Sequence, residues 1–323
     1  MLKRIDIRAC TPYKESMARK APYTVLCKDT DPQWLKMRLT GIGASSMATA
    51  LGISPYGSAY GLCLELMGDV EPADLSDNEY VEWGKRLEAV VMQAYAEKSG
   101  RLAWRSGLLL RSTLYPWALC TLDGLTAEPD KPRRRWPVEI KTATESHGDE
   151  WADGPPEQYR VQINAQMLVT GAEIVTAAVL LGGHRFAWCD VERDEKLIER
   201  IIKEGGALWD RVQRRDPPPI DASEACSSAI ARRYRVTDPR LVVRLPYDFV
   251  ELDAQLRRLK EEKSTADGEI KRIENEIKAA IGAGEAGVLP NGVTYTWIPQ
   301  TRAGYTVEPT VARVLRRKET DRE

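Results

Sequence analysis

The spacing of apolar residues divides the N-terminal part of the chain into helical segments. Helical spacing is expected over residues 33–39, which follow an Asp31-Pro32 start, and over residues 58–69 and 76–100, the last ending at Gly100. A glycine-rich turn that leads into a short helix of small residues is expected over 41–52. Residues 1–30 show no sustained periodicity and are expected to form a loosely attached arm.

The spacing changes to that of strands after Gly100. Strands are expected over 101–112, 117–124 and 136–143, and two more over 173–183 and 184–193. Helical spacing returns over 155–171 and 194–215. This order of helices and strands predicts an α/β domain over residues 31–215, with a mixed central β-sheet flanked by helices.

A proline-rich stretch marks the expected end of that domain. The sequence DPPPI at 216–220 is stiff and predicts a boundary. Beyond it, apolar residues alternate in three- and four-residue steps, which predicts a coiled-coil-like helix with a charged outer surface. A small β-hairpin is expected over 287–307, turning at 290–292 or near Gly304. Residues 216–323 are thus expected to form a helical and hairpin extension. The apolar positions of the helix are Leu252, Leu256, Leu259, Ala266, Ile270, Ile273, Ile277 and Ala280, with Lys263 as the polar exception.

Composition narrows the chemistry. Of the 323 residues, 43% are hydrophobic and 29% charged, and the net charge of −1 argues against passive coating of nucleic acid. No apolar run is long enough for a bilayer and the start lacks a signal-peptide core, so a cytoplasmic protein without a membrane partner is expected. Six scattered cysteines contain no CxxC pair, which disfavours a zinc or iron–sulfur site. With two histidines, carboxylates and lysine must carry any catalysis.

One expected strand carries a charged pair among apolar residues. In VEIKT (138–142), Glu139 and Lys141 share one strand face, and Asp123 stands where the preceding strand runs into a turn. If these strands pair, two carboxylates and the backbone carbonyl of Ile140 offer the oxygen ligands that Mg²⁺ takes, and Lys141 can orient or help deprotonate a water. The alternative is a surface ion pair of little energetic value.

The order of these motifs resembles the PD-(D/E)XK nuclease pattern. WLKMRLTGIGASSMATALGISPY (34–56), WGKRLE (83–88), TLDG (121–124), VEIKT and QYRVQINAQMLVTG (158–171) are similar to the YqaJ-type viral recombinases, the family that includes phage lambda exonuclease. The resemblance covers about residues 33–212. It implies a PD-(D/E)XK nuclease core.

The resemblance also implies roles for individual residues. Asp123 and Glu139 match the metal ligands, Lys141 the catalytic lysine and Glu88 a helix carboxylate that completes the acidic, metal-binding site. Mg²⁺ is the implied cofactor, with Mn²⁺ as a substitute.

A pocket for a terminal 5′-phosphate is implied as well. Arg38 and Ser45 keep the family's seven-residue spacing, and Gln162 matches a glutamine of the helix after the active-site strand. Thr121 stands where the family often has serine, and Leu122 replaces the usual proline before the aspartate. Tyr159 matches a family aromatic residue, for which packing is an equally good interpretation. A guanidinium with hydroxyl and amide donors suits a phosphate.

The implied activity is a Mg²⁺-dependent 5′-to-3′ exonuclease on linear double-stranded DNA. It would generate 3′ single-stranded overhangs for phage-type recombination, with a single-strand annealing protein as partner and a three-subunit ring as assembly. Two alternatives stay open: a PD-(D/E)XK endonuclease of restriction or repair type, and a non-catalytic DNA-binding recombination scaffold.

Overall fold

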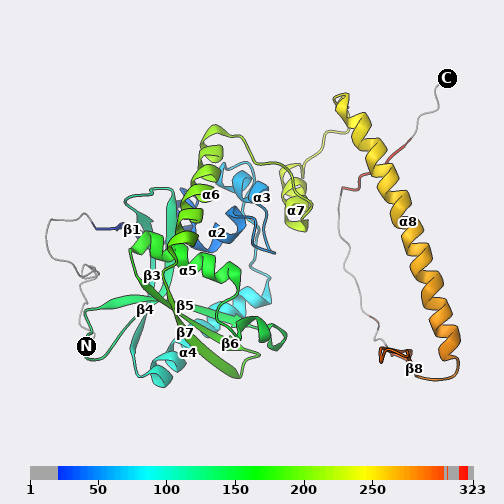
Figure 1. Ribbon diagram of the computed structural model, residues 1–323. Coiled ribbons are helices and arrows are strands. Elements are labelled where there is room, and N and C mark those ends of the chain that lie inside the picture. The colour runs from blue at the N-terminus through cyan, green and yellow to red at the C-terminus, as the bar shows by residue number, and fades with distance from the viewer. Residues whose placement is uncertain (1–20, 302–303, 305–312, 319–323) are drawn as a thin grey trace. The chain divides into compact units, whose positions relative to one another are not determined.

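The computed structural model describes residues 21–301, 304 and 313–318, and the chain divides into two compact units. The first unit runs up to Arg235 and the second begins at Val236 (Figure 1). Each unit has its own helices and strands. No helix among the described residues combines the length and the apolar character that crossing a membrane requires.

A mixed β-sheet forms the centre of the first unit, as the sequence predicted. The strand order is β1-β3-β4-β5-β6-β7, and the short β2 pairs in parallel with β4. β5 and β6 are parallel, whereas the other neighbours along this path are antiparallel. The strands are β1 (Tyr23–Lys28), β2 (Ile42–Gly43), β3 (Leu102–Ser112), β4 (Ala118–Ala127), β5 (Arg135–Ala143), β6 (Ile174–Leu181) and β7 (Arg185–Glu192).

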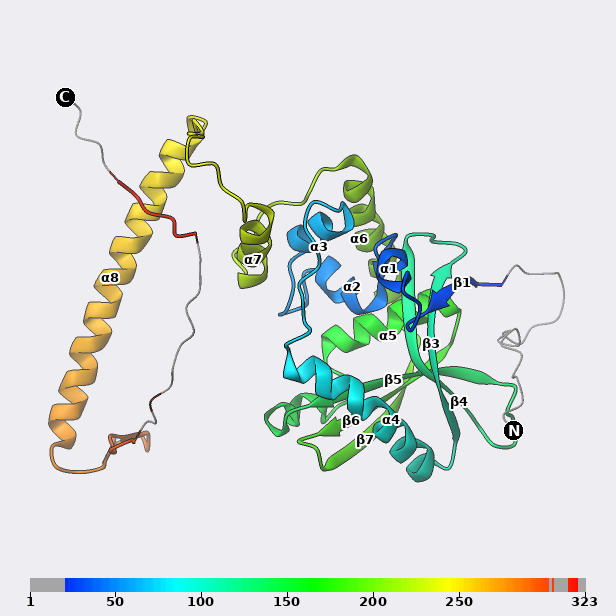
Figure 2. The ribbon, with the colours of Figure 1, turned by 180° about the vertical axis from the view of Figure 1, so that it is seen from behind.

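Helices cover both faces of this sheet (Figure 2). α4 packs through Val91, Met92 and Tyr95 against Val138 and Ile140 of β5. α5 covers the other face, where α2 and α6 pack on it and share one hydrophobic core with β3 and β4. The helices are α1 (Trp34–Arg38), α2 (Ala44–Ala50), α3 (Ala59–Leu66), α4 (Glu79–Ser99), α5 (Glu157–Thr170), α6 (Glu195–Arg214) and α7 (Glu224–Arg233), with 3-10 turns η2 (Glu145–His147) and η3 (Asp149–Trp151).

Both ends of the first unit extend beyond the expected limits. Residues 23–28, expected within an N-terminal arm, form the edge strand β1 and pair with β3. Residues 1–20 of that arm lie outside the described residues. The chain beyond the proline-rich stretch forms α7, which begins at the N-cap Ser223 and buries Cys226 and Ala229 against α3. β1 has no buried residue and α7 buries only two, so neither shows a clear apolar pattern in the sequence.

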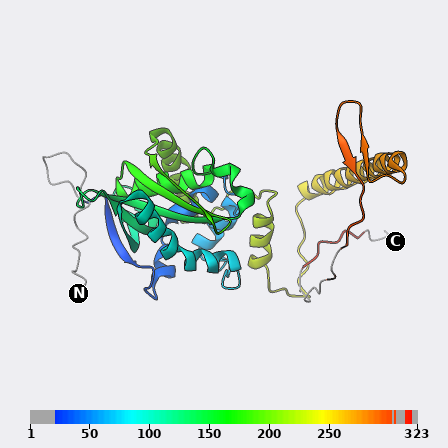
Figure 3. The ribbon, with the colours of Figure 1, turned by 90° about the horizontal axis from the view of Figure 1, so that it is seen from below.

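The second unit holds the long helix and the hairpin that the sequence predicted. α8 (Asp248–Ile281) has 34 residues, none of them buried. β8 (Ala286–Val288) and β9 (Thr294–Thr296) pair antiparallel as a small hairpin, visible in orange in Figure 3. The turn between them contains Gly292, whose N–H donates to Leu289 O, so it lies at the first of the two expected positions.

Candidate active site

The candidate site lies where β4 and β5 separate. Their ladder ends at the pair Gly124 and Val138, and beyond it Asp123 Oδ2 accepts a hydrogen bond from Ile140 N at 2.9 Å. Because the N–H and C=O of one strand residue point to the same edge, the Ile140 carbonyl also faces this opening. The structure therefore brings Asp123, Glu139 and the Ile140 backbone to one place.

Glu139 is the most enclosed member of the site. Its side chain is 2% exposed and points toward α5, where two glutamine amides meet it. Lys141 Nζ and Gln162 Nε2 donate to Oε1, and Gln166 Nε2 donates to Oε2. These three donors replace the water that the carboxylate oxygens lose on burial. The Glu139–Lys141 pair expected from the sequence does form, but inside the protein.

Lys141 is held in its charged state. Burial would by itself lower the pKa of the ammonium, but the nearby Glu139 and Asp123 carboxylates outweigh it and raise the pKa above its usual value. The ring of Tyr159, stacked on Trp151, faces the ammonium with 5.1 Å from Nζ to its centroid. A charged ammonium can donate hydrogen bonds but cannot take up a proton. Lys141 is therefore better suited to orient a water molecule than to act as a base.

The other two carboxyls of the site have raised pKa values, because burial outweighs the positive groups near them. Burial, reinforced by the charge of Glu139, raises the pKa of Asp123 to about 8 despite opposing effects of Lys141 and the Ile140 N–H. Glu88, on α4, also has a raised pKa, chiefly from burial, and the charges of Asp29 and Glu139 add to it. Three carboxyl groups thus gather around the opening, and two of them resist ionisation in the absence of a cation.

A divalent cation fits this arrangement of carboxyl groups. Asp123, Glu139 and the Ile140 carbonyl offer oxygen atoms, which are the ligands of Mg²⁺. Within the part of the chain that the structure describes, no three Asp, Glu, His or Cys side chains are grouped so that they could hold a metal ion, so Glu88 does not join Asp123 and Glu139 in one ligand group. The remaining ligand positions would then belong to water or to substrate phosphate, as is usual for Mg²⁺.

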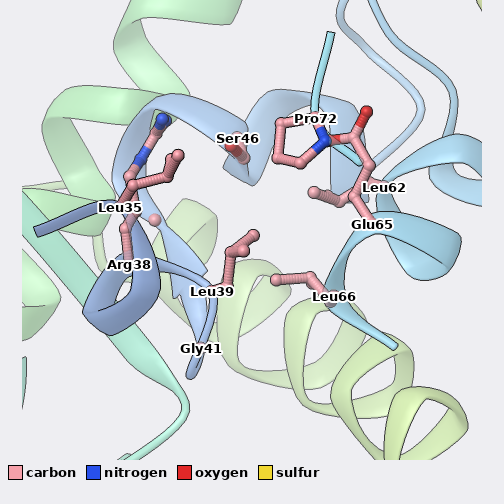
Figure 4. A pocket seen from close by; sticks show the side chains of 10 residues that line it. Leu35, Arg38, Leu39, Gly41, Ser46, Leu62, Glu65, Leu66 and Pro72 are labelled. Atoms are coloured by element: carbon pink, nitrogen blue, oxygen red, sulfur yellow. The ribbon is translucent and has the colours of Figure 1, made fainter. Parts of the chain in front are cut away.

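Arg38 and Ser45 also come together. Arg38 Nη2, at the end of α1, donates to Ser45 Oγ in the first turn of α2 at 2.8 Å. The guanidinium lies over the ring of Trp34 with 5.4 Å from Cζ to the ring centroid. Burial lowers the pKa of this guanidinium, and the charge of Glu65 opposes the shift. Arg38 lines a small pocket between α1 and α3 (Figure 4).

Arg38 and Ser45 are hydrogen-bonded to each other, whereas Gln162 and Thr121 have other neighbours in this structure. Gln162 donates to Glu139, so in this structure it supports the carboxylates. Thr121 is half-buried on β4, two residues before Asp123 and opposite Leu109 of β3. Binding of phosphate by these two residues stays a prediction. Gln166 was not predicted, although its position four residues after Gln162 places both amides on one side of α5.

This chain is similar to one known family and to several solved structures of exonucleases. The model of the YqaJ-like viral recombinase domain matches residues 33–173. The uncharacterized protein YqaJ of Bacillus subtilis (strain 168) is 31% identical over 274 residues, covering 83% of this chain and 84% of that protein. An alkaline exonuclease from Laribacter hongkongensis has a TM-score of 0.46 at 19% identity, over 58% of this chain and 94% of that one. A phage related exonuclease from Haemophilus somnus 129PT has a TM-score of 0.39 at 13% identity, over 56% and 96%.

Proposed function

We propose a specific reaction for this protein, which belongs to the YqaJ-like viral recombinase family and is thereby a DNA nuclease of recombination. The proposed reaction is Mg²⁺-dependent hydrolysis of one strand of linear duplex DNA, in the 5′-to-3′ direction, from its ends. It would leave 3′ single-stranded overhangs for single-strand annealing in the bacterial cytoplasm. The observation that carries the proposal is the group formed by the buried Glu139 and the half-buried Asp123 and Lys141 at the opening between β4 and β5.

The residues of the opening have separate parts in the proposed hydrolysis. Asp123 and Glu139, with the Ile140 carbonyl, would hold Mg²⁺, with Mn²⁺ as a substitute. A bound Mg²⁺ would activate water and offset the charge that develops on the scissile phosphate. Lys141, fixed by Glu139 and Tyr159, donates a hydrogen bond to the attacking water and adds positive charge close to the phosphate. Gln162 and Gln166 hold Glu139 in one orientation.

Arg38 and Ser45 support the choice of an exonuclease. A guanidinium already bonded to a hydroxyl, and close to the start of α2, can bind a terminal phosphate without reorganisation. A restriction-type endonuclease, which cuts within a duplex, has no use for a terminal phosphate. In a non-catalytic scaffold, no function would require Lys141 beside the Asp123 and Glu139 carboxyls. Cleavage assays on linear and circular DNA distinguish the exonuclease from these two alternatives.

The first experiment compares DNA substrates. Linear duplexes with a 5′-phosphate or a 5′-hydroxyl, and covalently closed circles, are incubated with the protein with and without Mg²⁺. Mononucleotides are expected only with metal, faster from the phosphorylated ends, while the circles stay intact. Cutting of the circles would establish the endonuclease alternative, and no cleavage of any substrate would establish the scaffold.

The second experiment assigns the lysine. Lys141→Ala should abolish cleavage and leave duplex binding intact, because the ammonium is needed for the reaction and not for the fold of the DNA-binding surface. Lys131→Ala, in the exposed turn before β5, is the matched control and should retain activity. Full cleavage by the Lys141 variant would remove this residue from the mechanism.

The third experiment tests the role of Arg38. Arg38→Ala should reduce the ratio of the cleavage rate on 5′-phosphate duplexes to the cleavage rate on 5′-hydroxyl duplexes. Arg86→Ala is its control, because Arg86 also lies over a tryptophan, Trp83, but is exposed on α4. An unchanged ratio in the Arg38 variant would refute the pocket.

The proposed partners are duplex DNA ends, a single-strand annealing protein and two further copies of the chain in a ring. Light scattering of the purified protein distinguishes a trimer from a monomer. Processive degradation of long duplexes, measured with excess competitor DNA added after the start, would support a closed ring around the substrate.

A further inference from the structure

The pocket that contains Arg38 also contains an acidic side chain. Glu65 of α3 lines it on the side opposite Arg38, between the apolar walls of Leu62, Leu66 and Pro72 (Figure 4). A carboxylate in a partly apolar pocket repels a phosphate strongly, because few water molecules screen the two charges. An anion can therefore enter this pocket only if the charge of Glu65 is neutralised by another group.

α7 supplies that group. Arg232 Nη2 donates to Glu65 Oε1 at 2.9 Å, and Nη1 donates to the carbonyl of Glu71 at 2.6 Å. The two side chains of this ion pair are 29% and 23% exposed, so the pair is partly shielded from solvent. The second hydrogen bond, to the backbone that leads into Pro72, fixes the guanidinium in one orientation. The Arg232 side chain therefore has little freedom to leave Glu65.

α7 is firmly attached to the wall of the pocket. It begins at Ser223, whose side chain accepts from Cys226 N, and it packs Cys226 and Ala229 against Tyr60 and Leu64 of α3. Arg233, the next residue, pairs with Asp69 and Tyr60 instead of Glu65. α7 lies beyond residues 33–173, the part of the chain that matches the family model.

We propose that Arg232 is a positioning residue for substrate, which neutralises Glu65 so that the α1–α3 pocket accepts the 5′-phosphate of a DNA end. The inference rests on the proposed function of Arg38. It gives α7 a part in the choice of substrate, although α7 contributes no group to the hydrolysis. The pair with Arg232 directs the Glu65 carboxylate toward α7 and leaves the Arg38 guanidinium for the phosphate.

The test uses the full chain and two readouts. Binding of a fluorescent duplex with a 5′-phosphate or a 5′-hydroxyl is measured by anisotropy in EDTA, and KM and kcat are measured with Mg²⁺. Arg232→Met should weaken binding of the phosphorylated duplex about tenfold, because one uncompensated charge at short range is of that order. KM should rise by a similar factor, whereas kcat and the affinity for the hydroxyl duplex should change less than about twofold.

A second substitution separates charge from packing. In Glu65→Gln/Arg232→Met the unneutralised carboxylate is gone, so the phosphate preference should return to within about twofold of the wild-type value. Arg232→Lys, which keeps the charge, should lose little preference. Arg233→Met is the matched control on α7 and should keep the preference, because Asp69 does not line the pocket.

The outcomes distinguish this inference from the proposed function. If Arg38→Ala removes the phosphate preference and Arg232→Met does not, the role of Arg232 is refuted and the pocket stands. If the double variant stays as weak as Arg232→Met, loss of α7 packing is the cause and the charge argument fails. If the wild-type protein has no phosphate preference, or Arg38→Ala leaves it unchanged, the pocket and the inference fail together.

Discussion

α5 and α8 are both helices with clear sequence periodicity, yet they differ in what surrounds them. Residues 161–169 of α5 are all buried, whereas α8 has no buried residue along its 34 positions. Apolar spacing thus predicts that a segment is helical but not how deeply it is buried. The two helices differ in the role of their polar residues.

The polar residues of α5 are placed for specific partners. Gln162 and Gln166 donate to Glu139, and Asn164 Oδ1 accepts from Asp194 N at 2.9 Å. Those of α8 form exposed pairs within the helix, such as Arg272 with Glu269 and Glu276. Exposed pairs contribute little to stability, whereas buried amides without partners are costly. Buried polar residues in a helix therefore indicate specific partners, which for two of these three residues are the oxygens of Glu139.

The largest difference between the helices should appear in stability. Ile163→Ala on α5 removes a fully buried side chain and should lower the free energy of unfolding by about 3 kcal/mol. Ile270→Ala on α8, where the isoleucine is 55% exposed, should change it by less than about 0.5 kcal/mol. Urea denaturation followed by tryptophan fluorescence measures both. Equal losses would contradict the burial of one helix and the exposure of the other.

The next effect is on catalysis. Gln166→Leu removes the donor to Glu139 Oε2, and loss of such a supporting hydrogen bond should lower kcat about 10- to 100-fold and raise the Mg²⁺ concentration needed for half activity. Gln255→Leu on α8 is the matched control and should keep full activity. The rate of mononucleotide release against Mg²⁺ concentration gives both quantities. A Gln166 variant with the wild-type metal dependence would separate this amide from the site.

A smaller effect is expected on the pH dependence of stability. The pKa of Asp123 is raised from 3.8 to about 8, so its contribution to stability is complete below pH 3.8 and is lost as pH rises through 8. In EDTA, the Tm of the wild-type protein should therefore fall between pH 5 and pH 9 relative to the Tm of Asp123→Asn, whose side chain cannot ionise. At pH 9, addition of Mg²⁺ should remove this difference in Tm between the two proteins. A constant difference in EDTA would exclude Asp123 as the titrating group.

The smallest effect concerns the second unit, where the sign is reversed. The hydrogen bonds from Arg317 lower the pKa of Asp253 on α8, so this interaction is present above the ordinary pKa and is lost as pH falls. Arg317→Ala should return the carboxyl titration of Asp253, followed by NMR, toward its usual range. The unfolding of the first unit should not change. An unaltered Asp253 titration would show that another group lowers the pKa.

The sequence predicted the sheet, its main helices and the central charged pair, because each has a period or a motif long enough to be detected. It missed β1, which has no buried residue, and α7, which buries only Cys226 and Ala229, because neither has a marked apolar pattern. Strand alternation located Asp123, Glu139 and Lys141, and the family resemblance implied their roles. Neither could show that Glu139 is buried and met by Gln166, since that depends on how α5 crosses β5.

The alternation of side chains along β5 limits which mutations this stretch of the gene can accept. Side chains alternate along β5, so Glu139 and Lys141 reach α5 while Ile140 faces α4. Insertion or deletion of one codon between Val138 and Lys141 would exchange the two faces and place an apolar residue against the glutamines. Point substitutions at Val138 and Ile140 to other apolar residues keep the alternation. This stretch should therefore tolerate variation in residue type far better than variation in length.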